Sequence, residues 1–142
     1  MLFPRKAQSL ILAGAVTAAF CMPAVADLPV PRPVHQGDIT YLTGGIGRGE
    51  RHALEAQAHN YNFEITNANK AGAFTNDAAL VIETGKGRDV LSVTGSGPLF
   101  YAKLSPGDYA IRATNGAQHQ LRHVKIAAKG TTDLHLIWKQ AG

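Results

Sequence analysis

The stretch from Leu104 to Ile126 constrains the fold of this chain more than any other part of the sequence. A Pro106-Gly107 pair favours a reversal of the chain, and Asn115-Gly116 is typical of a two-residue β-hairpin loop. Between these pairs the residues alternate between an apolar face and a face that can meet water. The apolar residues of this alternation are Tyr109, Ile111 and Ala113. The pattern predicts antiparallel β-sheet.

The same alternation continues through most of the chain and is interrupted by turns rich in glycine. We count about seven short apolar runs, which is the rhythm of a β-sandwich. The return strand after Gly116 is less regular, because Leu121 has the opposite parity to Val124 and Ile126. This irregularity predicts a bulge or a sheet-edge position between His119 and Arg122.

The residues that carry this pattern resemble a known family. The run Leu104-Ser-Pro-Gly-Asp-Tyr-Ala-Ile-Arg-Ala113, followed by Gly116 and Val124-Lys-Ile126, is similar to the carboxypeptidase regulatory-like domains. With Tyr41-Leu-Thr-Gly-Gly-Ile-Gly47 upstream, the chain looks most like the small exported proteobacterial proteins that carry this domain. The resemblance covers roughly residues 41 to 138. It implies a seven-stranded prealbumin-like, transthyretin-like (immunoglobulin-like) sandwich that acts as an accessory module and has no zinc site of its own.

Residues 1–26 have the three parts of a signal peptide. Arg5 and Lys6 precede an apolar stretch that is short for a membrane span, and Ala24-Val25-Ala26 is a small-residue cleavage motif. We therefore expect cleavage after Ala26 and export either to the periplasm or out of the cell. The remaining 116 residues contain no cysteine and no apolar run long enough to predict a membrane span.

The mature chain is short enough to be one domain and long enough to bury a core without disulfides. Residues 27–37 contain three prolines at alternate positions and predict an extended lead, which could lie along the domain or hang free. Residues 38–142 then form the sandwich domain. Twelve Lys and Arg stand against ten Asp and Glu, and no basic run is present. We expect no nucleic-acid partner.

The glycine cluster Gly44-Gly45-Ile46-Gly47-Arg48-Gly49-Glu50 is the least ordinary stretch of the sequence. The residues after it predict the only helix, at about 49–60, inserted at one end of the sandwich, with an inward stripe at Ala53, Leu54, Ala58 and Tyr61.

Glycines at a helix start let backbone amides approach an anion closely. We therefore name Gly44, Gly45, Gly47, Arg48 and Glu50 as a hypothetical ligand site. Arg48 would pair with an acidic group, the amides would cradle it, and Glu50 would hold the loop or a cationic group. The ligand would be an envelope protein or a small anion. The alternative is a purely structural turn and helix cap.

Other residues support further hypotheses. Tyr101 is out of phase with its apolar neighbours, so we expect it to face outward with Lys103 as a surface aromatic. His52 and His59 lie seven residues apart, about two helical turns, which is too far to bind one Cu²⁺ or Zn²⁺ directly. A metal site through these histidines remains an alternative function. A third possibility is strand addition at the irregular strand near His119 to Arg122.

Nothing in the sequence indicates catalysis. The mature chain has no cysteine nucleophile, no Gly-x-Ser-x-Gly elbow and no His-Glu-x-x-His helix. We expect a binding or scaffold module that is not an enzyme and needs no cofactor. Trp138 and Tyr109 are in phase with apolar neighbours, so we expect them in the core with each polar tip bonded at the rim.

Overall fold

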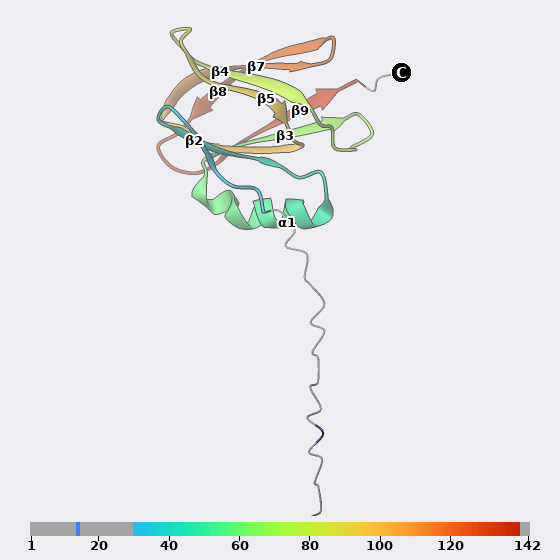
Figure 1. Cartoon of the computed structure of the whole chain (residues 1–142). Helices are drawn as coiled ribbons and strands as arrows, with labels where there is room; N and C mark the ends of the chain where they lie inside the picture. The colour runs from blue at the N-terminus through green and yellow to red at the C-terminus, as the bar shows by residue number, and fades with distance from the viewer. Residues whose placement is uncertain (1–13, 15–29, 140–142) are drawn as a thin grey trace, which may run out of the picture.

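The computed structural model of the chain describes Gly14 and residues 30–139 (Figure 1). The predicted signal peptide, apart from Gly14, and the first three residues of the Pro-rich lead lie outside the described residues. Within the described part, no helix is both long and apolar enough to cross a membrane.

The described chain is mainly β and forms two sheets, as the alternation predicted. Sheet A has the order β1-β2-β6-β3-β9 and sheet B the order β5-β4-β7-β8. All neighbouring strands are antiparallel except β3 and β9, which are parallel. The strands are β1 (Val34–Gln36), β2 (Ile39–Gly44), β3 (Phe63–Asn69), β4 (Ala78–Thr84), β5 (Asp89–Ser96), β6 (Leu99–Lys103), β7 (Gly107–Asn115), β8 (Gln118–Ile126) and β9 (Thr132–Trp138).

The predicted number of seven strands is wrong, because nine are found in the described chain. One of the additional strands is β1, which lies inside the segment assigned to the Pro-rich lead. After Pro33 no further proline removes a backbone donor, so Val34 to Gln36 can pair with β2 through a turn at Gly37. The lead also lies along the domain at Pro31, which lies next to Gly44.

One core fills the space between the two sheets and contains Phe63, Ile65, Phe100 and Leu136 from sheet A and Leu80, Ile82, Leu91 and Ile111 from sheet B. Trp138 and Tyr109 are buried in it, as predicted. The indole N–H of Trp138 donates to Asn67 Oδ1 at 3.0 Å, and the Tyr109 hydroxyl donates to the Ser105 carbonyl at 2.7 Å.

The structure adds two details to the predictions about the Leu104 to Ile126 stretch. β6 and β7 belong to different sheets, so the Pro106-Gly107 pair carries the chain across the sandwich and does not close a hairpin. β8 pairs with β7 in unbroken register from Gln118 to Ile126, so no bulge is present there. Leu121 is out of phase because it lies opposite Arg112 on the outer face of sheet B, where it is 57% exposed. The predicted sheet-edge position and the Asn115-Gly116 hairpin are both found.

The helix α1 (Arg48–Gln57) and the 3-10 turn η1 (Ala58–Asn60) connect β2 to β3, close to the predicted bounds. α1 does not lie at the end of the sandwich, however, but across the outer face of sheet A (Figure 1). Leu54 and Tyr61, with Ala58 partly buried, pack there against Leu42, Leu99 and Tyr101.

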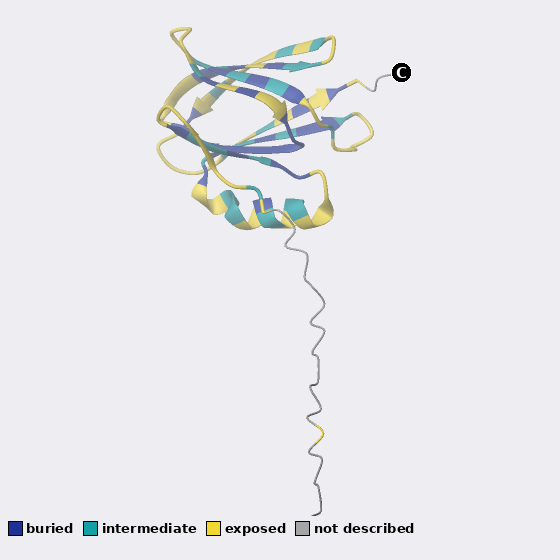
Figure 2. Ribbon diagram, in the orientation of Figure 1, coloured by how far each residue is buried: buried dark blue, intermediate teal, exposed yellow. Residues whose placement is uncertain are grey.

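Tyr101 therefore corrects the prediction of a surface aromatic. Its side chain does point out of the sandwich, as its parity requires, but α1 covers it and leaves it only 2% exposed. Figure 2 shows the strands of sheet A next to the helix coloured mainly as buried. Lys103, two residues further along β6, is exposed as expected.

Glutamine side chains join the sheets along both open sides of the sandwich. Gln36 of β1 donates to Ser92 O and accepts from Ser92 N–H, at 3.1 and 2.8 Å. On the other side, Gln118 makes the same pair of bonds with Lys139, and Gln120 donates to Ile137 O. These amides bond as a neighbouring strand would, so backbone groups of β5 and β9 are already occupied.

Candidate functional site

The predicted glycine site is the connection between β2 and α1. Gly47 is the N-cap of α1, and Glu50 lies in its first turn. The Glu50 carboxylate folds back and accepts a hydrogen bond from the Gly45 N–H at 2.8 Å. Glu50 thus holds the loop, as one of our hypotheses stated. The same bond means that the Gly45 amide already has an internal carboxylate as its partner.

Close packing explains the first two glycines. Gly44 has a φ of 156°, and a Cβ there would collide with the Glu50 carboxylate. A Cβ on Gly97, in the turn before β6, would come within 2.5 Å of the Gly44 carbonyl oxygen. The Gly97 N–H donates to Thr43 Oγ1 at 3.0 Å, and that hydroxyl donates to Leu99 O at 2.8 Å. Gly44 and Gly45 are buried by these contacts.

The exposed part of the loop is Ile46 to Gly49. Ile46 is 68% exposed, although it directly follows the buried Gly45. The stem of Arg51 packs against Gly45, and the Arg51 guanidinium carbon lies 4.7 Å from the centre of the Phe74 ring. Phe74 is itself 44% exposed. We call the surface formed by Ile46, Arg48, Arg51 and Phe74 the loop patch.

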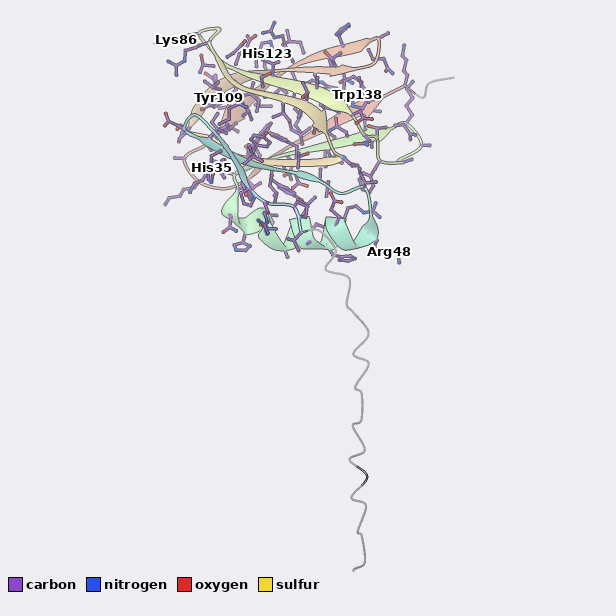
Figure 3. All side chains as sticks on the ribbon, viewed as in Figure 1. His35, Arg48, Lys86, Tyr109, His123 and Trp138 are labelled. Carbon is purple, nitrogen blue, oxygen red and sulfur yellow. The ribbon has the colours of Figure 1, made fainter. Side chains whose placement is uncertain are left out.

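Arg48 is the first residue of α1, and its side chain is exposed (Figure 3). Among the described residues, ion pairs are found only at Arg112, which lies 3.3 Å from Asp89 and also contacts Glu83. Arg48 therefore has no acidic partner within the part of the chain that the structure describes. The structure brings Gly44, Gly45 and Glu50 together and leaves Gly47 and Arg48 at the surface beside them.

Sequence reasoning missed the apolar members of the loop patch. Ile46 was read as part of a glycine turn, although it is the one large apolar side chain between Gly44 and Glu50. Phe74 lies between β3 and β4 in a mostly polar segment, in which it is the only aromatic residue. In both places an isolated apolar side chain in a polar segment was the available signal.

A second group of polar residues lies on the outer face of sheet A. Glu64 of β3 is directly opposite Asp133 of β9 and opposite Tyr101 of β6. Burial raises the pKa of Glu64, and the neighbouring Asp133 carboxylate raises it further. Bonding to Tyr101 and the charge of His135 act in the opposite direction. Burial also raises the pKa of Tyr101, with Glu64 and Glu55 of α1 adding to the effect.

The histidines give no geometric support to a metal centre. His52 is exposed on α1 and His59 is exposed in η1. Within residues 30–139, no three His, Asp or Glu side chains are grouped so that they could hold a metal ion.

A hollow of about 600 Å³ lies at the other end of the sandwich, between the β4–β5 loop and the start of β7. Lys86 and Arg88 line it together with Asp108 and Tyr109. Figure 3 shows Lys86 and Tyr109 far from Arg48. Because charges of both signs line this hollow, it favours no one class of ligand.

Comparisons with known proteins add no family. No family model matches this chain, and no curated protein matches it. Among solved structures, the Bacillus anthracis TIE protein is similar over 54% of this chain and 15% of that protein's chain, with 20% sequence identity and a TM-score of 0.43. A similarity at this level carries no argument about function.

Proposed function

We propose that this chain is an exported, non-catalytic binding module of the cell envelope, and that it docks an envelope protein through the loop patch. The resemblance to carboxypeptidase regulatory-like domains, which are accessory modules with a prealbumin-like sandwich, supports a role without catalysis. The signal-peptide pattern supports export. The observation that carries the proposal is the exposure of Ile46 on a loop that is fixed from within, next to Arg51, which in turn contacts the exposed Phe74.

The loop patch has the composition of a binding surface. Exposed apolar side chains that gather at one place mark interaction sites more often than scattered ones do. The Glu50 bond to Gly45 and the contact of Gly97 with Gly44 hold the backbone on either side of Ile46. Ile46 is therefore presented without the loss of loop entropy that a flexible segment would suffer on binding.

The chemistry of the patch indicates the partner. Ile46 and Phe74 suit an apolar side chain of the partner, and Arg48 suits an acidic one at the rim. The amides of the loop have a smaller role than the sequence suggested, because Glu50 already occupies that of Gly45.

The alternative of strand addition at β8 is less favourable in this geometry. A strand added at His119 to Arg122 would lie between β8 and β9, where Gln118 and Gln120 already bond the β9 backbone. The incoming strand would have to part these bonds before it could pair.

The test is quantitative capture from envelope extract with the mature chain, residues 27–142, as bait. The variant Ile46→Ser/Arg48→Ala removes one apolar and one cationic side chain from the loop patch. The matched control Leu121→Ser/Arg122→Ala removes the same two side-chain types from β8, where both residues are exposed.

We expect the loop variant to lose a partner that the parent and the β8 control both retain. The captured partner is then purified and its affinity for the three baits is compared directly. Equal affinity for the parent and the loop variant would refute the loop patch as the docking surface.

A further inference from the structure

The outer face of sheet A is covered only in part. α1 packs on β2 and β6, through Leu54 against Leu42, Leu99 and Tyr101. The outer residues of β3 and β9 lie beyond it in three rows in register, which we call the open strip. The rows are Glu64 with Asp133, Thr66 with His135, and Ala68 with Ile137. Phe74 bridges to Ala68 and extends the third row toward the loop patch.

The open strip changes in chemistry along its length. At one end, Glu64 and Asp133 are two carboxylates directly opposite each other, which destabilises a sheet. Glu55 of α1 adds a third carboxylate near Tyr101. No Lys or Arg among the described residues forms an ion pair with any of them. At the other end, Ile137 and Phe74 are each 44% exposed and pair with the buried Ala68 from either side.

The vacant width fits one helix. Five strands spaced about 4.8 Å apart make a sheet roughly 20 Å wide, and a helix with its side chains is about 10 Å across. α1 lies over β2 and β6, and a second helix placed about 10 Å to its side would lie two strands further along the sheet, over β3 and β9. The four residue steps from Glu64 to Ala68 span about 13 Å, which is close to the rise of two helical turns, about seven or eight residues.

We propose that the open strip binds a cationic amphipathic helix of a partner protein, laid beside α1. A Lys or Arg of this helix lies against Glu64 and Asp133, and an apolar side chain about seven or eight residues away, two turns along the same helix face, lies against Phe74 and Ile137. The inference rests on the proposed function, since it takes the same side of the molecule as the docking side and specifies the partner's chemistry.

The test uses two model peptides of about 18 residues, one a Leu/Lys amphipathic helix and the other its Leu/Glu isomer. Each is titrated into the ¹⁵N-labelled mature chain. We expect the Leu/Lys peptide to shift the amide resonances of Glu64, Thr66, Asp133, His135 and Ile137, with an affinity that falls as salt is added. The Leu/Glu isomer should leave these resonances unmoved.

Variants test the two ends of the open strip separately. Asp133→Asn is an exposed and nearly isosteric change. Combined with Glu64→Gln, it should lower the affinity for the Leu/Lys peptide at least tenfold. Ile137→Ser should also weaken it, and Leu121→Ser on sheet B should leave it unchanged.

The inference is overturned if both peptides shift the open strip equally, or if the Leu/Lys peptide binds elsewhere or not at all. If the inference fails in this way but the Ile46→Ser/Arg48→Ala variant still loses its partner, the proposed function is unaffected. Unchanged capture by that variant refutes the loop patch, whatever the peptides do.

Discussion

The two halves of the outer face of sheet A have the same strand geometry but opposite surroundings. On β2 and β6, outward side chains such as Leu42 and Tyr101 are buried beneath α1. On β9, the outward side chains Asp133 and Ile137 are exposed, although Asp133 lies in the same row as Leu42 and Tyr101. The outward side chains Glu64 and Thr66 of β3, between the two, are half-buried. The difference shows that alternation decides which way a side chain points, whereas a separate element decides whether it meets water.

The covered half has one function that the open half lacks, which is to fix the glycine loop. α1 brings Glu50 to Gly45 and Arg51 to Phe74. The loop patch and the open strip therefore meet at Phe74, which α1 contacts through Arg51. Changes in the covered half should cost stability, and changes in the open half should mainly affect binding.

Leu54→Ala should have the largest effect on stability. Leu54 is fully buried and is the main contact of α1 with Leu42 and Tyr101, so its truncation should lower the free energy of unfolding by about 2–5 kcal/mol. Urea denaturation measures this loss. The matched change Ile137→Ala on the open half should stay within about 0.5 kcal/mol. Equal losses would mean that α1 does not cover sheet A as described.

Gly97→Ala should have the second-largest effect on stability, because its Cβ would collide with the Gly44 backbone. Overpacking of this kind costs about 1–3 kcal/mol, which differential scanning calorimetry would record as a lower melting temperature. Gly47→Ala, where the space around the new Cβ is open, should cost less. A loss at Gly97 no larger than at Gly47 would contradict the close approach of the two backbones.

Glu50→Ala should cost about 1–2 kcal/mol, because it leaves the N–H of the buried Gly45 without its partner. Glu50→Gln retains an acceptor oxygen and should cost less. Amide hydrogen exchange at Gly45 reports the bond directly and should accelerate in Glu50→Ala alone. Unchanged exchange in that variant would remove Glu50 as the residue that fixes the loop.

Glu64→Gln should have the smallest effect on the free energy of unfolding and, unlike the other variants, should raise it at neutral pH. The pKa of Glu64 is raised in the folded chain by burial and by Asp133, so the folded state holds this proton more tightly than the unfolded state. The resulting stabilisation is complete below the ordinary pKa near 4.5 and is lost as pH rises through the raised value.

At neutral pH Glu64→Gln should therefore stabilise the fold by about 0.2–1 kcal/mol, the range for a like-charged cross-strand pair. Urea denaturation between pH 4 and 8 should show a weaker pH dependence for the variant than for the parent. An identical pH dependence would show that Glu64 and Asp133 do not repel each other.

The sequence alone was sufficient for those features that depend on neighbours along the chain. Alternation placed Tyr109 and Trp138 in the core, and the glycine cluster placed the start of α1. Prediction from the sequence failed where segments that are distant along the chain come into contact. The burial of Tyr101 depends on where α1 lies, and the role of Phe74 depends on a contact with Arg51. The Pro106-Gly107 reversal was visible, but not that β6 and β7 enter different sheets.

The most direct test of the account is site-specific photocrosslinking in the intact envelope. A benzophenone side chain is placed in turn at Ile46, Ile137 and Leu121, three exposed apolar positions, of which only Leu121 lies on sheet B. The account predicts that positions 46 and 137 crosslink to the same partner and that position 121 does not. Crosslinking from position 121 alone would place the docking surface on sheet B and contradict the account.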